Sequence, residues 1–306
     1  MMIDITDKRV TLRRAVAEAT IVVDPDVAVA IRQGDVPKGS VIDVTRAAAL
    51  LGIKRTPDLL PFCHPIPIDR GTVSVEVGDG VVRVHVEVAA IARTGVEVEA
   101  MTGAAVAALN VYDMVKPLDP TTHIGEIRLL EKKGGKSDHT EHFDRPLRAG
   151  VLVVSDSVAA GTKKDSAGLG VRELLSEHDI EVASTEVVAD EPDEIQRRLR
   201  NWCDEDGLDF VFVVGGTGLG PRDSTPEAVR PLLDREIPGL AEAVRAYGRE
   251  RTPLADLSRA VGGQRGTTIV VAVAGSTRGA REALQALMPW LRHVLKVFDI
   301  SYRHGR

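Results

Sequence analysis

Lys132–Val154, KKGGKSDHTEHFDRPLRAGVLVV, divides this chain of 306 residues into two parts. Up to Pro146 the stretch is polar, contains two glycines and ends in proline, which is typical of a linker between domains. Its last four residues, Val151–Val154, form a continuous apolar run of the kind that begins a buried parallel sheet. The chain is too long for one ordinary core and suffices for two domains of about 150 residues each. We therefore predict one domain over residues 1–140 and a second over residues 148–306.

The two halves differ in the spacing of their apolar residues. In the first half, Thr72–Val77 and Val82–Val88 alternate apolar and polar residues on either side of Gly78-Asp-Gly80, which predicts an antiparallel hairpin with one polar face. Helices are predicted around it, at about 40–54 and 96–114, so this half is expected to be α+β. In the second half, short apolar runs alternate with helical segments, which predicts a doubly wound parallel α/β sheet. These runs are 151–154, 182–188, 210–214 and 269–274.

Composition and charge exclude several classes of protein. Hydrophobic residues make up 43% of the chain and charged residues 27%, which is typical of a soluble globular protein. Basic and acidic residues number 18 and 21 in residues 1–145, and 21 and 24 in residues 146–306, so neither half has the positive excess of a nucleic-acid binder. No apolar segment reaches the roughly 18 residues of a membrane span, and Met1–Val10 lacks the apolar core of a signal peptide. Two cysteines, Cys63 and Cys203, argue against a disulfide framework or a cysteine-rich zinc site, and we predict a cytoplasmic protein.

Glycine-rich loops and acidic side chains follow the predicted strands of the second half. In an open α/β sheet, ligands bind at the carboxyl ends of the strands, so these segments are expected to meet. Glycine lets backbone N–H groups approach phosphate oxygens closely, and the N-terminus of a following helix adds a positive dipole. That helix is predicted to have Thr225 as its N-cap and Pro226 at its first position. The candidate nucleotide and pterin site comprises Ser155, Asp156, Asp190, Gly215, Gly216, Thr217, Gly218, Asp223, Gly275 and Ser276.

The segment Gly215–Glu227, GGTGLGPRDSTPE, is the most distinctive motif of this candidate site. Taken alone, the loop is equally well explained as a tight turn. A turn or capping role is the weaker alternative for Asp190 and Asp223. The segment resembles the central motif of the molybdopterin adenylyltransferase family (MogA and MoaB), and the resemblance extends over nearly the whole second half. It implies that the terminal phosphate of molybdopterin attacks the α-phosphorus of ATP, with Mg²⁺ held by Asp190 and Asp223. The chain departs from the family at Ala274 and Thr277, where prolines usually stiffen the last loop.

Several residues of the first half are chemically richer than packing requires. They are Lys38, Lys54, Arg55, Phe62, Cys63, His64, Asp113 and Lys116. Considered singly, Cys63 fits a small core residue, His64 a loop histidine, and Lys54-Arg55 a complement to a helix C-terminus. Together the segments KRTPDLLPFCHP, TGVEVEAMT, YDMVK and GGKS resemble the cyclic pyranopterin monophosphate synthase family (MoaC). This resemblance covers about residues 2–140.

The MoaC resemblance implies a ferredoxin-like α+β fold and a reaction that converts a cyclic dihydro-GTP derivative into cyclic pyranopterin monophosphate and diphosphate. It implies proton transfer by Asp113, Lys116 and Lys38, which a carboxylate or a lysine of lowered pKa can perform. No tightly bound cofactor is expected in this half. The departures from the family are Ser40 for Asp and Val98 for Met. The implied substrate-binding residues are Lys54, Arg55, Phe62, Cys63, His64, Val98, Glu99 and Lys136.

The spacing of Glu99 and Asp113 limits how such a site can be built. The two residues are 14 positions apart on one predicted helix, so they share a face about 21 Å apart at 1.5 Å per residue. That distance exceeds one compact site, so two chains must contribute if both residues act together. The two resemblances imply a hexamer (a trimer of dimers) and a trimer respectively, and a homo-hexamer suits both.

These observations favour a bifunctional enzyme of molybdenum cofactor biosynthesis. Its expected partners are small molecules: the cyclic dihydro-GTP derivative, molybdopterin and ATP with Mg²⁺, with neither nucleic acid nor membrane. One alternative makes the second half a non-catalytic pterin-binding or assembly module, supported only by the altered loop at Ala274–Thr277. Another makes the whole chain a non-catalytic nucleotide-binding regulatory protein, which the dense lysine, aspartate and histidine motifs disfavour.

Overall fold

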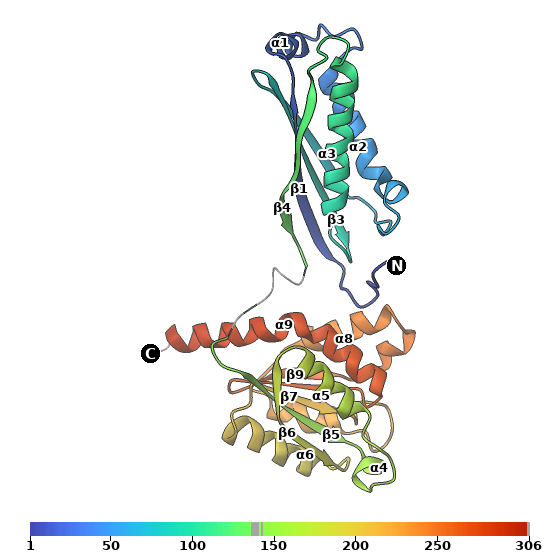
Figure 1. Cartoon of the computed structure of the whole chain (residues 1–306). Helices are drawn as coiled ribbons and strands as arrows, with labels where there is room; N and C mark the ends of the chain where they lie inside the picture. The colour runs from blue at the N-terminus through green and yellow to red at the C-terminus, as the bar shows by residue number, and fades with distance from the viewer. Residues whose placement is uncertain (136–140, 142, 305–306) are drawn as a thin grey trace. The chain divides into compact units, whose positions relative to one another are not determined.

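The computed structural model describes residues 1–135, 141 and 143–304, and the chain divides into two compact units, residues 1–138 and 139–306 (Figure 1). Each unit buries hydrophobic side chains of its own. Within the described ranges, no helix combines the length and the hydrophobicity needed to cross a membrane.

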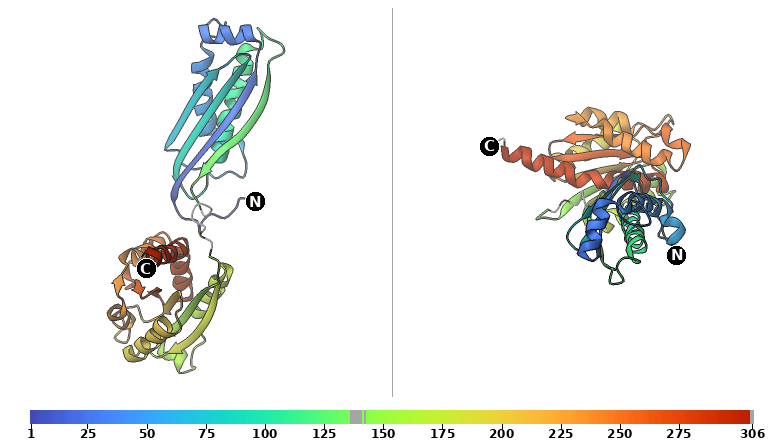
Figure 2. Two further views of the ribbon diagram at one scale, coloured as in Figure 1. Left: turned by 90° about the vertical axis from the view of Figure 1, so that its left-hand side faces the viewer. Right: turned by 90° about the horizontal axis from the view of Figure 1, so that it is seen from above.

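The first unit is a four-stranded sheet with helices on one face (Figures 1 and 2). Its elements in order are β1 (Thr11–Val22), α1 (Pro25–Gln33), α2 (Val41–Leu59), β2 (Arg70–Val77), β3 (Val81–Ala92), α3 (Glu97–Val115) and β4 (His123–Lys133). The strand order is β2-β3-β1-β4, and each pairing is antiparallel. This arrangement confirms the predicted α+β class, and the predicted hairpin is β2 and β3.

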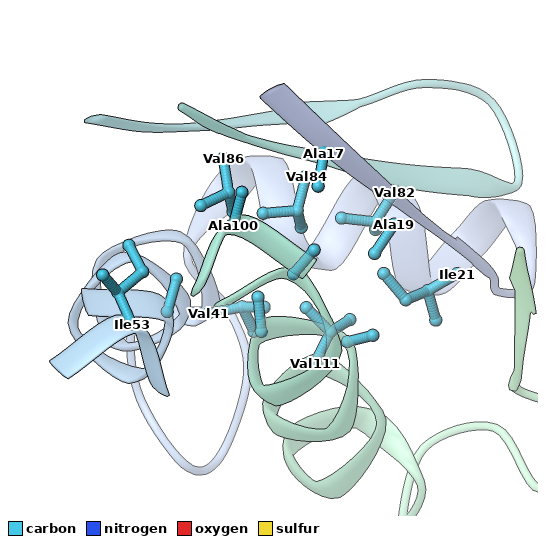
Figure 3. Packing of buried hydrophobic residues seen from close by; sticks show 14 of the residues in the cluster. Ala17, Ala19, Ile21, Val41, Ile53, Val82, Val84, Val86, Ala100 and Val111 are labelled. Carbon is cyan, nitrogen blue, oxygen red and sulfur yellow. The ribbon is translucent and has the colours of Figure 1, made fainter. Parts of the chain in front are cut away.

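Small side chains let α2 and α3 pack closely on the sheet and on each other. Ala17 and Ala19 of β1 have no exposed surface and face the same core as Ala100 of α3 (Figure 3). Where α2 crosses α3, a side chain on Gly103 would come within 2.8 Å of Ile53. Glycine at this crossing therefore sets how near the two helices can lie, and it fixes the positions of the residues at their ends.

Helix α2 runs through Pro57 to Leu59, whereas the sequence predicts its end at Lys54. Proline has no N–H group, so the carbonyl of Ile53 loses its usual helical donor. The Thr56 hydroxyl donates to that carbonyl at 3.1 Å, and this bond satisfies the acceptor. The predicted helix end at Lys54 is therefore wrong by five residues.

The second unit is a six-stranded sheet between two layers of helices (Figures 1 and 2). Its strands are β5 (Leu147–Val154), β6 (Ile180–Val188), β7 (Phe210–Val214), β8 (Arg235–Glu236), β9 (Val261–Arg265) and β10 (Thr268–Val273). Helices α5 (Ala167–Glu177), α8 (Pro238–Arg249) and α9 (Thr277–His304) cover one face. Helices α6 (Pro192–Arg200) and α7 (Thr225–Val229) cover the other, and a π-helical turn (Asn201–Glu205) extends α6. Short turns of helix are α4 (Asp156–Ala159), Arg230–Leu232 and Pro253–Leu257.

The sheet confirms the α/β class but is mixed rather than wholly parallel. Its order is β6-β5-β7-β10-β9-β8, in which the first four strands are parallel to one another, β9 is antiparallel to β10, and β8 is antiparallel to β9. Only Gly266 and Thr267 separate β9 from β10, and so short a connection can join only antiparallel strands. The sequence did not predict β9 because Gly262 and Gly263 weaken its strand pattern. A side chain on Gly263 would come within 2.3 Å of the Arg235 carbonyl oxygen, so the edge strand β8 requires glycine there.

Part of the predicted linker packs against the second unit. The Glu141 carboxylate contacts Lys296 of α9. Phe143 packs against the hydrophobic core beneath the same helix. The Arg145 guanidinium donates two hydrogen bonds, of 2.7 and 2.5 Å, to the carboxylate of Asp209, which is buried. A fragment of the second unit must therefore begin at or before residue 141 to keep these contacts.

Candidate active sites

A lysine–aspartate–lysine network joins the start of α2 to the end of α3. The Lys38 ammonium donates to Asp113 twice, to Oδ2 at 2.7 Å and to the backbone oxygen at 2.8 Å. The Lys116 Nζ lies 2.8 Å from the other carboxylate oxygen, Oδ1. Gly39 provides the turn between Lys38 and α2 with a φ of 96°, a left-handed conformation that favours glycine. The structure thus brings together the three residues to which the sequence assigns proton transfer.

The charges of this network shift the pKa values of Asp113 and Lys116. Hydrogen bonds from Lys116 and Lys38 lower the pKa of Asp113 to about 2. The same contact with Asp113 raises the pKa of Lys116. The pKa of Lys116 is therefore not lowered, because an ionised carboxylate stabilises its charged form. In this pair the ionised Asp113 is the counter-ion of a protonated Lys116.

A second cluster lies at the other end of the two helices. Helix α3 presents Glu99, which is only 2% exposed, to the loop that follows α2. The Cys63 thiol of that loop donates to Glu99 Oε1 at 3.4 Å. The buried Oε2 has no hydrogen-bond partner among the described residues, and burial raises the pKa of Glu99. Phe62 and Val98 are exposed beside this pair and His64 is half-buried, so apolar surface and an unsatisfied carboxyl oxygen occur together.

Glu99→Gln should make the protein more stable at neutral pH. A carboxyl whose folded pKa is raised destabilises the fold once it ionises, so stability falls as pH rises above the unfolded pKa near 4.5 and through the folded value. The amide carries no such cost. We expect a higher free energy of unfolding than wild type at about pH 8 and no difference at about pH 4, measured by denaturant titration. A variant less stable than wild type at the higher pH would contradict the assignment of Glu99 as an acid that burial destabilises in its ionised form.

The Cys63 thiol should react slowly with alkylating agents. Burial, followed by the nearby Glu99 charge, raises its pKa to about 11, and the thiolate is the reactive form. Glu99→Gln removes that charge and should therefore speed labelling by iodoacetamide at a fixed pH of about 8.5. A Cys63→Ser chain gives the background from Cys203, which is buried. Equal labelling rates with and without the Glu99 charge would argue against the contact.

The two clusters lie at opposite ends of one antiparallel helix pair. Asn110 of α3 donates to Thr45 of α2 at 3.0 Å near one end, whereas Gly103 meets Ile53 near the other. Because α3 is continuous from Glu97 to Val115, the estimate of about 21 Å between Glu99 and Asp113 holds. The remaining predicted cations are Lys54 and Arg55, which are exposed, and Lys136, which lies outside the described residues.

The carboxyl ends of β5, β7 and β10 meet at glycines in the second unit. Gly215 donates its N–H to Val273 at 3.0 Å, and a side chain on it would come within 2.1 Å of the Val154 carbonyl oxygen. A side chain on Gly275 would come within 3.0 Å of the Gly215 Cα. Gly215 and Gly216 also have φ of 116° and 61°, which favour glycine. These contacts bring the two predicted glycine-rich loops together at one edge of the sheet.

Two aspartates at this edge, Asp156 and Asp190, each accept a hydrogen bond from the other's backbone N–H. The Asp156 N–H donates to Asp190 Oδ2, and the Asp190 N–H donates to Asp156 Oδ1, each at 3.0 Å. Burial raises the pKa of Asp190, and the neighbouring charges of Asp156 and Asp223 raise it further. A concentration of negative charge at a strand end attracts cations, which is consistent with the predicted Mg²⁺ ligands Asp190 and Asp223.

Arg259 fastens the loop that carries Asp223. Its guanidinium donates to the backbone oxygens of Gly218 at 2.8 Å and Asp223 at 2.6 Å, and it contacts Glu227. The Asp223 carboxylate in turn accepts the Gly220 N–H at 2.7 Å. These contacts of Arg259 could not be predicted from its own segment, because its partners lie more than 30 positions away.

The helix after this loop begins differently from the prediction. Ser224, not Thr225, occupies the N-cap position of α7. Thr225 is fully buried, and its N–H donates to the Gly216 oxygen at 3.0 Å. A residue whose N–H closes the glycine loop lies inside the first turn, so the predicted N-cap is wrong by one residue.

Hydroxyl groups brace the loop that lacks the usual prolines. The Ser276 Oγ accepts the Gly279 N–H at 3.2 Å at the start of α9. The hydroxyls of Thr277 and Ser166 lie 2.7 Å apart and join the starts of α9 and α5. The departure from proline at Ala274 and Thr277 is thus accompanied by hydrogen bonds that restrain the same backbone.

Both halves of the chain match known protein families. Residues 2–135 match the MoaC family and residues 150–293 match a probable molybdopterin binding domain. The molybdenum cofactor biosynthesis bifunctional proteins of Chlorobaculum tepidum and Synechococcus elongatus are each 38% identical, over 95% and 97% of this chain and 92% and 97% of their own lengths. The cyclic pyranopterin monophosphate synthase of Pelobacter propionicus is 48% identical over 45% of this chain and 87% of its own length. The chain belongs to the family of bifunctional molybdenum cofactor biosynthesis proteins.

Proposed function

We propose that the first half is a cyclic pyranopterin monophosphate synthase. The observation that carries this proposal is the network of Lys38, Asp113 and Lys116, in which one carboxylate orients two ammonium groups. The similarity of this half to the synthase of Pelobacter propionicus supports it. Its substrate would be a cyclic dihydro-GTP derivative, and its products cyclic pyranopterin monophosphate and diphosphate.

In this reaction the network would supply both charge and protons. Asp113 stays ionised and holds Lys116 as a general acid, while Lys38 adds positive charge beside a triphosphate. The cluster of Cys63 and Glu99 would contact the purine-derived part of the substrate. Its buried, unsatisfied oxygen on Glu99 is suited to a donor group on that substrate.

For the second half we propose adenylylation of molybdopterin by ATP. The motif at Gly215–Glu227 and the match to a molybdopterin binding domain support this activity. The described residues contain no group of three His, Cys, Asp or Glu side chains placed to hold a metal ion. Mg²⁺ that accompanies phosphates commonly uses only one or two protein carboxylates, so Asp190 and Asp223 fit it. When bound, the ion would neutralise charge on the phosphates, while the amides of the glycine loops orient them.

A homo-hexamer, arranged as a trimer of dimers, would let two chains share each site of the first half. The support is the separation of the Glu99 and Asp113 clusters along one continuous helix. A non-catalytic second half remains the competing hypothesis, and its support is the absence of proline at Ala274 and Thr277.

Expression of the halves apart tests both activities. Residues 1–140 should fold and release diphosphate from the cyclic dihydro-GTP derivative without ATP, because the two units have separate cores. Residues 141–306 should adenylylate molybdopterin only with Mg²⁺ and ATP. A matched fragment, 148–306, lacks the Arg145–Asp209 contact and should be less stable by about 1–3 kcal/mol in denaturant titration. Folded but inactive fragments, from a full chain that is active, would contradict independent sites.

A further inference from the structure

Arg222 joins the loops that follow three neighbouring strands of the second unit. It lies after β7, and its Nε and Nη2 donate to the two carboxylate oxygens of Asp156 after β5, each at 3.0 Å. Its Nη2 also donates to Glu191, after β6, at 2.8 Å. One guanidinium therefore spans the edge of the sheet at which the glycine loops meet.

Asp156, which Arg222 holds in place, is in turn hydrogen-bonded to Asp190. Both oxygens of Asp156 are taken by protein donors, because Oδ1 also accepts the Asp190 N–H at 3.0 Å. The returning bond from the Asp156 N–H engages Asp190 Oδ2. The other oxygen, Oδ1, is directed toward Gly216, because a side chain there would come within 2.9 Å of it. The orientation of Asp190 toward the glycine loop thus depends on Asp156, and that of Asp156 depends on Arg222.

We propose that Arg222 is a positioning residue for adenylyl transfer, which acts through Asp156 to aim Asp190 at the glycine loop. This inference rests on the proposed function of the second half. It reassigns Asp156, which the sequence groups with nucleotide- and pterin-binding residues, to an internal role, because its carboxylate is already occupied by Arg222 and the Asp190 backbone.

The Arg222–Asp156 pair is poorly suited to a purely stabilising role. The two side chains are 56% and 47% exposed, and exposed ion pairs contribute little to folding. Geometry at a reacting centre is far more sensitive, since a displacement of about 1 Å can cost up to about 100-fold in rate. The bidentate contact also requires a guanidinium, because an ammonium cannot engage both carboxylate oxygens in the same plane.

The test compares full-length chains carrying Arg222→Gln, Arg222→Lys, Asp156→Asn and Arg222→Gln/Asp156→Asn. Arg222→Gln should lower kcat for adenylyl transfer by about 10- to 100-fold and raise the Mg²⁺ concentration for half-maximal rate, with a smaller change in KM for ATP. Arg222→Lys should recover only part of kcat. The double variant should be no slower than the slower single variant, because both substitutions remove the same contact between Arg222 and Asp156.

Arg265→Gln is the matched control. Arg265 also forms a paired contact with an aspartate, Asp204, at 2.9 and 2.5 Å, but it is less exposed and lies beside the start of β10, at the opposite edge of the sheet. It should lose at least as much stability as Arg222→Gln while keeping adenylyl transfer. The unfolding transition of the second unit in denaturant measures its folding in each variant, and diphosphate release by the first half measures the amount of chain present.

Two results would overturn the inference and can be told apart. Additive losses in the double variant, with a large rise in KM for ATP, would mean that Arg222 binds phosphate directly. If Arg222→Gln kept the kcat and the Mg²⁺ dependence of the wild type, Arg222 would have no role in adenylyl transfer. A wild-type chain that makes no adenylylated molybdopterin would overturn the proposed function together with this inference, whereas an active wild type with either result above would overturn this inference alone.

Discussion

A mixture of Glu99→Gln chains and Asp113→Asn chains should regain about a quarter of wild-type cyclic pyranopterin monophosphate synthase activity, although each variant alone should lose about 10²–10⁴-fold. The clusters of Glu99 and Asp113 are held about 21 Å apart on α3, so one chain cannot place both at one substrate. If each site draws one cluster from each of two chains, random pairing leaves about one site in four with both residues intact. The measurement is diphosphate release after the subunits have exchanged.

Lys38 offers a matched control for this experiment. It contacts Asp113 directly, so it belongs to the same cluster. Lys38→Gln chains should therefore complement Glu99→Gln chains but should not complement Asp113→Asn chains. No recovery in the first mixture, once exchange between tagged chains has been verified, would rule out the shared site. Recovery in the second mixture would separate Lys38 from Asp113.

Asp223→Asn should lower adenylyl transfer by about 10²–10³-fold, the magnitude associated with loss of one group that stabilises a charged transition state. The carboxylate accepts the Gly220 N–H at 2.7 Å, and an amide oxygen can accept the same bond. The substitution therefore keeps the loop and removes only the charge that would help hold Mg²⁺. The measurement is the rate of molybdopterin adenylylation against Mg²⁺ concentration.

The first half provides the control for Asp223→Asn. Its diphosphate release should be unchanged, and the unfolding transition should shift little because Asp223 is only half-buried and lies in a loop. Loss of adenylyl transfer together with a large shift in the unfolding transition of the second unit would indicate a folding defect. Unchanged adenylyl transfer would contradict the assignment of Asp223 to the site.

Local sequence patterns predicted the elements more accurately than their edges. The strand Phe210–Val214 and the hairpin of β2 and β3 follow from apolar runs and alternation, because these patterns act over a few neighbouring residues. The extension of α2 through Pro57 depends on a hydroxyl of Thr56, which composition does not reveal. The edge strand β9 escaped detection because its glycines serve close backbone packing rather than strand propensity.

The sequence predicted which residues belong to the candidate sites but not which of them contact one another. Lys38 and Asp113 are 75 positions apart, and they meet only because α2 and α3 pack antiparallel. The raised pKa of Lys116 follows from Asp113, three residues earlier on the same helix, whereas the lowered pKa of Asp113 depends also on the distant Lys38. Arg222 stands beside Asp223 in the sequence motif, yet its partner Asp156 lies 66 positions away at another strand end.

The central claim is that one chain carries two independent chemistries that each release diphosphate. The most direct measurement is diphosphate release by the intact chain, first with the cyclic dihydro-GTP derivative alone and then with molybdopterin, ATP and Mg²⁺. We expect release in the first case without ATP, and in the second only when molybdopterin and Mg²⁺ are both present. A chain that binds both sets of substrates but releases diphosphate from neither would contradict the claim and favour a regulatory protein.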